Sequence, residues 1–295
     1  MTTIWQQVTV RVNKSQTEPV EDALLNLGAC SVTFSDAEDQ PQYEPAIGET
    51  KLWDATNVTG LFEDHAPLLD IQTHLLSEQL ITSANEVQLE TLEDQVWERA
   101  WMKDFKPMQF GEKLWICPTG FTVDATDALI IDLDPGLAFG TGTHPTTALC
   151  LEWLDRNPPT NKTVIDYGCG SGILAIAAAK LGATQCAAVD IDPQAIEATL
   201  INAENNQVTQ HIACYLPEQF QPFKADTLIA NILAAPLVTF AELFSTLIKP
   251  GGQIALSGIL EEQTNMVLEA YHPYFNLQPP KQQGDWILIT GELKR

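Results

Sequence analysis

The segment from residue 163 to residue 182 constrains the fold of this chain more than any other. A short apolar run at residues 163–165 leads to Asp166, and three glycines then alternate with other residues, at Gly168, Gly170 and Gly172. Good helix formers follow and end in a Lys and a Gly stop signal. A strand, a glycine turn and a helix start in this order make a nucleotide-cofactor site, because glycines let the backbone approach a ligand and the helix start presents free N–H groups. The alternative is a turn that only connects a strand to a helix.

The next predicted strand, at residues 187–189, also ends in an acidic residue. Asp190 lies near the offset of ~20 residues at which an acidic side chain meets the ribose hydroxyls of a nucleotide cofactor. Asp192 is expected to cap the following helix, at residues 194–206, and Pro193 suits its first turn.

Asp166 bears on which cofactor the glycine turn holds. Its carboxylate stands just before the glycines, where it would repel a pyrophosphate at close range. A cofactor with a cationic amino-acid tail tolerates that charge better. The sequence therefore favours S-adenosylmethionine over a dinucleotide.

A further polar side chain follows a buried strand later in the chain. Residues 225–231 are predicted to form a strand that ends in Asn231, and Pro236 is expected to start the next helix. Ligand groups in open α/β sheets cluster at the carboxyl ends of the strands. Asn231 is therefore a candidate binding residue, and the alternative is a simple helix cap.

The loop before the cofactor segment is a candidate lid. Residues 135–143 carry no charge and are rich in Gly and Thr, between predicted strands at 114–117 and 128–133 and a predicted helix at 146–155. Such a loop can fold over a cofactor and exclude water, although an ordinary strand-to-helix connection has the same place. His144, at the end of this loop, is a candidate base or a structural residue.

Several motifs together resemble one superfamily and one family within it. The stretches VIDYGCGSG, AVDIDP, ANILAAP and IKPGG look like those of class I S-adenosylmethionine-dependent methyltransferases. The longer stretches DPGLAFGTGTHPTT and WERAWMKDFKPMQFGEKLWICP resemble the bacterial ribosomal-protein methyltransferase family that acts on large-subunit protein eleven. The resemblance covers nearly the whole chain. It implies a Rossmann-like methyltransferase fold. The strands predicted from the sequence itself, with a last, antiparallel strand at residues 286–290 after the turn at Gly284, give a doubly wound α/β sheet of about seven strands.

The resemblance also implies roles for single residues. Thr147 is the loop residue that touches the cofactor, together with Gly168, Gly170 and Asp190. The side-chain oxygen of Asn231 and the next backbone carbonyl orient the amino group toward the methyl, as in the Asn-Pro-Pro-aromatic motif of methyltransferases that act on nitrogen. In this chain the prolines and the aromatic residue are replaced, by Ile232, Leu233 and Ala234. The missing aromatic wall fits an alkyl amine better than adenine.

The first 92 residues are predicted to form a small α+β domain. Strands and helices alternate in the order β-α-β-β-α-β of a ferredoxin-like fold, with the first helix capped by Thr17 and closed by Gly28. A helical linker is expected at residues 93–110, with a helix at 95–105, and the catalytic domain at 111–295. The first domain contains no catalytic constellation. In the family that the chain resembles, this domain grips the substrate protein.

Composition narrows the classes of partner. There are 15 Lys plus Arg against 39 Asp plus Glu, which gives a formal net charge of -24 and no run of basic residues. Such a surface repels nucleic acid and attracts a strongly basic protein, so a ribosomal protein is favoured as substrate over RNA. The six cysteines are scattered, which argues against a metal site and disulfides. We expect a cytoplasmic protein, because no signal peptide or membrane span is evident. We also expect a monomer.

The favoured function is transfer of methyl groups from S-adenosylmethionine to amino groups of a large-subunit ribosomal protein, either lysine side chains or the N-terminal α-amine. Three alternatives remain at this point. They are a nucleic-acid N-methyltransferase with the same cofactor fold, an NAD-dependent oxidoreductase, and a non-enzymatic assembly factor with a dead cofactor site. The sequence has no Tyr-x-x-x-Lys pair for hydride transfer.

Overall fold

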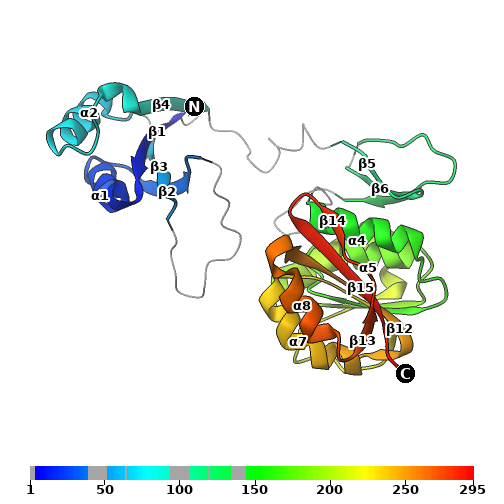
Figure 1. Cartoon of the computed structure of the whole chain (residues 1–295). Coiled ribbons are helices and arrows are strands. Elements are labelled where there is room, and N and C mark those ends of the chain that lie inside the picture. The colour runs from blue at the N-terminus through cyan, green and yellow to red at the C-terminus, as the bar shows by residue number, and fades with distance from the viewer. Residues whose placement is uncertain (1–3, 39–51, 64, 94–105, 119, 134–143) are drawn as a thin grey trace. The chain divides into compact units, whose positions relative to one another are not determined.

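The structure is a computed structural model that describes residues 4–38, 52–63, 65–93, 106–118, 120–133 and 144–295. The chain divides into two compact units, Met1–Trp97 and Glu98–Arg295, and each is described here by itself (Figure 1). Among the described residues, no helix combines the length and the apolar character that a bilayer crossing requires.

In its described residues, the N-terminal unit is a four-stranded antiparallel sheet with two α-helices. Its elements are β1 (Ile4–Asn13), α1 (Thr17–Asn26), β2 (Ser31–Asp36), β3 (Ala55–Glu63), α2 (Leu68–Ser77) and β4 (Val87–Glu93). The strand order is β2-β3-β1-β4, with every neighbouring pair antiparallel. Alternate residues of β1 face the helices and are buried, and they form one core with side chains of α1 and α2, including Val8, Val10, Leu24, Ile71 and Leu75.

One local expectation for this unit is wrong. Thr17 does not cap α1 but is its first residue, and Gln16 stands at the cap position. The strand β3 runs without interruption from Ala55, because its residues pair continuously with β1.

The C-terminal unit is built on a mixed sheet. Its strands are β8 (Thr163–Tyr167), β9 (Gln185–Val189), β10 (Ile212–Tyr215), β11 (Ala225–Asn231), β12 (Ile248–Leu260), β13 (Phe275–Leu277), β14 (Lys281–Gln283) and β15 (Trp286–Leu293). The order is β10-β9-β8-β11-β12-β15-β13, and β14 pairs with β15. The first five strands are parallel, and β15 is antiparallel to β12, as the sequence predicted.

The predicted count of seven strands is not confirmed, because this sheet has eight. Three strands of this sheet, β10, β13 and β14, were not predicted from the sequence. Of these, β14 is a three-residue Lys-Gln-Gln segment that is exposed throughout and folds back on β15 at Gly284. Such a strand has no apolar alternation from which to predict it.

A second, three-stranded sheet accounts for two strands predicted near the start of this unit. It consists of β5 (Met108–Phe110), β6 (Leu114–Cys117) and β7 (Leu129–Asp132), with β6 in the middle. Side chains of β6 and β7, among them Leu114, Ile116 and Ile131, join the core that surrounds α5. The predicted linker helix at residues 95–105 lies outside the described residues.

Helices cover both faces of the main sheet (Figure 1). They are α4 (Pro145–Arg156), α5 (Ile173–Lys180), α6 (Pro193–Asn205), α7 (Ala234–Thr246) and α8 (Thr264–Tyr271). The side chains of α4 and α5 form one core with the sheet, and those of α7 and α8 form another. Every residue of α5 except Lys180 is buried, because this Ala-rich helix contacts β8, β9, α4, α6 and β7 at once.

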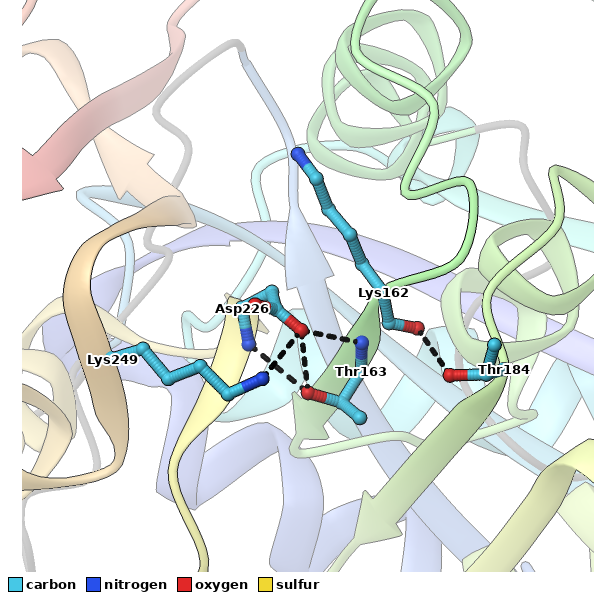
Figure 2. A network of polar contacts seen from close by, with 5 residues as sticks. All are labelled: Lys162, Thr163, Thr184, Asp226 and Lys249. Atoms are coloured by element: carbon cyan, nitrogen blue, oxygen red, sulfur yellow. Dashed lines mark hydrogen bonds and ion pairs between the residues drawn. The ribbon is translucent and has the colours of Figure 1, made fainter.

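A polar network joins the amino ends of the central strands, at the edge opposite the carboxyl ends (Figure 2). The Asp226 carboxylate accepts hydrogen bonds from the Thr163 N–H and hydroxyl, both at 2.9 Å, and from Lys249 Nζ at 2.8 Å. Burial by itself raises the pKa of Asp226, but the bonds from Lys249 and Thr163 outweigh it, so that the pKa lies below its ordinary value. The network therefore ties β8, β11 and β12 together through an ionised carboxylate.

Replacement of this carboxylate tests the network. We expect Asp226→Asn to lower the free energy of unfolding at pH 7 by about 1 kcal/mol, because it removes a partly exposed ion pair and one charged acceptor. The pKa of Asp226 is lower in the folded than in the unfolded state. The greater unfolding free energy of the wild type over Asp226→Asn is therefore lost as the pH falls below about 4. Urea denaturation at several pH values measures it, with the exposed Asp127→Asn as control. An advantage that is the same at pH 3 and pH 7 contradicts this interpretation.

Candidate active site at the carboxyl edge of the sheet

The glycine turn between β8 and α5 is held by the end of the neighbouring strand β9. Gly168 and Cys169 donate their N–H groups to the Val189 carbonyl oxygen, at 2.7 and 3.1 Å. The backbone at Gly168 and Gly170 has positive φ values of 83° and 54°, which side chains disfavour. The turn therefore has one shape, set by an acceptor from the adjacent parallel strand.

The glycines also permit close packing within the protein. A Cβ atom at Gly168 would overlap the side chain of Ile232, and one at Gly172 would lie 2.6 Å from Thr199 Cγ2. Thr199 is completely buried on α6, and its hydroxyl donates to the Gly170 carbonyl at 3.1 Å. From the sequence, these glycines were expected to serve ligand approach. Thr199 was not predicted, since a threonine inside a helix carries no distinctive sequence signal.

Asp190 is joined directly to the turn. One carboxylate oxygen accepts the Gly170 N–H at 2.9 Å, and the other accepts the Asp192 N–H at 3.0 Å. A carboxylate oxygen can accept more than one hydrogen bond, so both oxygens of Asp190 keep capacity for ligand hydroxyls. Asp192 caps α6 by accepting the Gln194 N–H at 2.9 Å, as predicted.

Asn231 ends β11 at the same edge of the sheet. Its side-chain Nδ2 donates to the Thr147 hydroxyl oxygen at 3.3 Å, and Thr147 is completely buried in the first turn of α4. Because this bond orients the carboxamide, the Asn231 Oδ1 remains as an acceptor. The predicted lid at residues 135–143 lies outside the described residues.

His144 is the N-cap residue of α4. Its ring Nδ1 accepts the Thr146 N–H at 3.4 Å and lies 2.7 Å from the Thr146 hydroxyl. The ring packs edge-on against Trp286, with centroids 4.7 Å apart, and burial lowers its pKa. These contacts belong to a capping residue and correspond to the structural alternative for His144.

Asp166 is completely buried beneath the glycine turn. Its Oδ2 accepts the Ala175 N–H in the first turn of α5 at 3.0 Å, whereas its Oδ1 has no hydrogen-bond partner among the described residues. Burial, opposed by the bond from Ala175 and aided by the nearby Asp190 charge, raises the pKa of Asp166 to about 7. The expected repulsion of a pyrophosphate by this carboxylate therefore applies to its ionised fraction only.

The five residues predicted to form the site thus lie on elements that meet at the carboxyl edge. Two hydrogen-bonded pairs connect four of them, namely Gly170 with Asp190 and Thr147 with Asn231. Contact of these residues with a cofactor stays a prediction. Among the described residues, no group of three or more His, Cys, Asp or Glu is placed to hold a metal ion.

A mostly parallel sheet with a glycine turn after one strand, an acidic residue after the next and an asparagine at the same edge defines the methyltransferase-like α/β fold. The model of the family described as "Ribosomal protein L11 methyltransferase (PrmA)" matches residues 4–294. The chain belongs to this family of methyltransferase enzymes.

Individual relatives agree with this assignment. Proteins named ribosomal protein L11 methyltransferase from Actinobacillus pleuropneumoniae serotype 5b and from Escherichia coli O8 are each 50% identical to this chain. The matches cover 98% and 97% of this chain, and 99% and 98% of the respective relatives. A crystal structure of ribosomal protein L11 methylase from Lactobacillus delbrueckii subsp. bulgaricus superimposes with a TM-score of 0.59 at 33% identity, over 65% of this chain and 100% of that chain.

The raised pKa of Asp166 has a measurable effect on stability. Its folded-state pKa of about 7 exceeds the unfolded value of about 3.9, so the folded state holds one extra proton between these limits. The contribution of Asp166 to the free energy of unfolding is complete below the unfolded pKa of about 3.9. It declines as the pH rises toward 7, by up to about 1.4 kcal/mol per pH unit. We expect Asp166→Asn to lack this decline, so that its unfolding free energy rises relative to wild type over the same range.

Urea denaturation between pH 4 and pH 8 measures the difference in unfolding free energy between Asp166→Asn and wild type. The control is Asp192→Asn, at the exposed cap residue of α6. A difference between Asp166→Asn and wild type that stays constant with pH is the contradicting result.

Proposed function

We propose that this chain transfers methyl groups from S-adenosylmethionine to amino groups of ribosomal protein L11, on lysine side chains, on the N-terminal α-amine or on both. The observation that carries the proposal is the Asn231–Thr147 pair, which holds an amide oxygen at the carboxyl edge of a methyltransferase fold. Membership of the ribosomal protein L11 methyltransferase family supports the choice of substrate.

The residues at this edge fit S-adenosylmethionine. Both oxygens of Asp190 keep acceptor capacity for the two ribose hydroxyls. The Oδ1 of buried Asp166, which no described residue contacts through a hydrogen bond, gives the region under the turn a negative potential when the carboxyl is ionised. That potential suits a ligand with sulfonium and ammonium charges. When bound, S-adenosylmethionine supplies an electrophilic methyl group on its sulfonium, from which a neutral thioether is a good leaving group.

The protein contributes position rather than acid–base chemistry. The Asn231 oxygen accepts an N–H of the substrate amine, and the bond to Thr147 prevents the carboxamide from presenting its NH₂ group instead. The amine must be neutral to attack: a lysine with a pKa near ~10.4 is mostly charged at pH 7, whereas an α-amine near ~7.7–8.0 is much less so. Desolvation at an apolar edge lowers the pKa of either amine.

The surroundings of Asn231 favour an alkyl amine over a nucleobase. Ile232 and Leu233 follow it in place of flat or aromatic residues, and Leu233 is 53% exposed. An aliphatic side chain offers contact for the methylenes of a lysine but no stacking surface for adenine. The net charge of -24 also opposes nucleic acid and favours a basic protein, so we propose no direct binding of RNA.

We further propose that the N-terminal unit is a ferredoxin-like domain, residues 1–92, that binds the substrate protein, joined by a linker at 93–110 to the catalytic domain at 111–295. The observed order β1-α1-β2-β3-α2-β4 and the sheet order β2-β3-β1-β4 support the fold. A ribosomal substrate implies that the protein works in the cytoplasm, and we propose that it acts as a monomer.

Methyl incorporation tests the function. The protein is incubated with methyl-labelled S-adenosylmethionine and ribosomes that lack these modifications, and the labelled bands are analysed by mass spectrometry. Label on amine nitrogens of L11 is the expected result. Label in ribosomal RNA that survives protease would establish the nucleic-acid alternative, and label nowhere would overturn the proposal.

The Asn231–Thr147 pair has separable parts. We expect Asn231→Ala to reduce kcat for L11 methylation by roughly 100-fold, because the amine loses its orienting acceptor. Thr147→Val retains shape but removes the hydroxyl that orients Asn231, and we expect a loss of about 10-fold. Steady-state kinetics measure both changes, with exposed Thr239→Val on α7 as control. Full activity of Asn231→Ala contradicts the assigned role.

Asp190 and Asp192 form a matched pair for the cofactor. We expect Asp190→Asn to weaken binding of S-adenosylmethionine by about 10- to 100-fold, because a charged acceptor of ribose hydroxyls is worth about 1.5–3 kcal/mol. Asp192→Asn preserves the cap of α6, since Asn caps a helix as well as Asp, and leaves affinity unchanged. Titration calorimetry measures both. Equal affinities for the two variants exclude Asp190 as the ribose ligand.

A further inference from the structure

The chain turns sharply immediately after Asn231, and the turn is enclosed by two glycines from other strands. A Cβ atom at Gly168, after β8, would overlap Ile232 Cγ2. A Cβ atom at Gly258, in β12, would overlap the Ile232 carbonyl oxygen and lie 2.7 Å from its carbonyl carbon and 3.1 Å from its nitrogen. The Ile232 peptide is thus confined on one side by Gly258, while its side chain is confined by Gly168.

Gly258 reaches this position through a β-bulge. In the pairing of β12 with β15, Leu256 pairs with Ile289 and the next pair is Ile259 with Ile287. The step is three residues on β12 and two on β15, so β12 has one extra residue here. The residues in the bulge are Ser257 and Gly258, and Gly258 has a φ of +84°. Bulges re-aim backbone and are frequent beside active sites.

The bulge lies directly beside Asn231. In the parallel pairing of β11 and β12, Asn231 is the partner of Ser257. Ser257 is completely buried, and its hydroxyl donates to the Ile287 carbonyl of β15 at 3.0 Å, which fixes the bulge from the other side. The position of Gly258 is therefore set by the sheet and not by the loop that carries Ile232.

The Ile232 carbonyl oxygen takes no part in the regular hydrogen bonding of the elements beside it. It lies between the end of β11 and the cap residue of α7, Leu233, so no helix or strand bond uses it. No donor from the described part of the chain hydrogen-bonds to it. An acceptor held rigidly one residue after Asn231 can receive a second N–H of the amine whose first N–H is held by Asn231.

We propose that Gly258 is a positioning residue for methyl transfer, because the Ser257–Gly258 bulge, with Gly168 opposite, fixes the Ile232 carbonyl that aligns the substrate amine. This inference rests on the proposed amine methylation. Gly258 touches neither amine nor cofactor and acts through the Ile232 peptide. Two acceptors at fixed positions leave the amine lone pair one direction, toward the methyl group.

The test compares two glycines with positive φ in the same unit. Gly258→Ala places a methyl group against the Ile232 peptide, whereas Gly284→Ala, at φ +59° and with no atom within 4 Å of its Cβ, adds strain alone. We expect Gly258→Ala to lower kcat with L11 by roughly 100-fold, the loss for reacting groups misplaced by about 1 Å. The affinity of Gly258→Ala for S-adenosylhomocysteine, measured by calorimetry, stays at the wild-type value. Gly284→Ala keeps the wild-type kcat and the wild-type affinity.

Two further variants separate collision from strain and from misfolding. Gly258→Asn carries the same Cβ atom as Gly258→Ala, but Asn tolerates a positive φ. If collision with Ile232 is the cause, kcat of Gly258→Asn falls as far as that of Gly258→Ala. If backbone strain is the cause, kcat of Gly258→Asn returns toward the wild-type value. Ile232→Leu removes the Cγ2 methyl that meets Gly168 without crowding the bulge, and we expect kcat to fall with cofactor affinity retained. This variant decides the matter if neither Gly258 variant folds.

The outcomes are distinct. Wild-type kcat in Gly258→Ala, recovery in Gly258→Asn, parallel loss of S-adenosylhomocysteine affinity, or wild-type kcat in Ile232→Leu each overturns the role of the bulge. Absence of L11 methylation by the wild-type protein overturns the proposed function itself.

Discussion

The candidate site depends on the hydrogen bonds that the end of β9 makes to the glycine turn. The Val189 carbonyl accepts two N–H groups of the turn, and the Asp190 carboxylate accepts a third, from Gly170. A glycine-rich segment has many conformations of similar energy, so its shape must be imposed from outside. Because the acceptors belong to the adjacent parallel strand, the shape of the turn, the start of α5 and the position of Asp190 are set together.

Burial supplies the electrostatic character of the same region. Asp166 holds the first turn of α5 by accepting an N–H that Gly172, at the cap position, has no side chain to satisfy. Its second oxygen has no hydrogen-bond partner in the described part of the chain, and burial of the carboxyl raises the pKa of Asp166 to about 7. An ionised carboxylate costs most where no cation is near, so a cationic ligand over the turn and a charged Asp166 favour each other.

The amine end of the site is assembled from separate elements. Asn231 comes from β11, its partner Thr147 from α4, and Gly258, which confines the Ile232 peptide, from β12. Each of these positions is determined by core packing rather than by a flexible side chain. Such preorganisation suits a reaction that requires alignment of a lone pair with a methyl group and makes little demand on acid–base catalysis.

Sequence alone was sufficient where the determining physics is local. The β8-turn-α5 unit, the cap at Asp192 and the antiparallel β15 follow from apolar runs, glycine positions and capping chemistry within a few residues. The Asn231–Thr147 bond joins residues 84 positions apart, and the resemblance to a family, not any pattern, brought Thr147 into the site. The polar β14, the separate β5–β7 sheet, the burial of Asp166 and the bulge at Gly258 were decided by tertiary structure. They depend on which surfaces pack together, and close approach between distant backbone segments leaves no periodic signal in the chain.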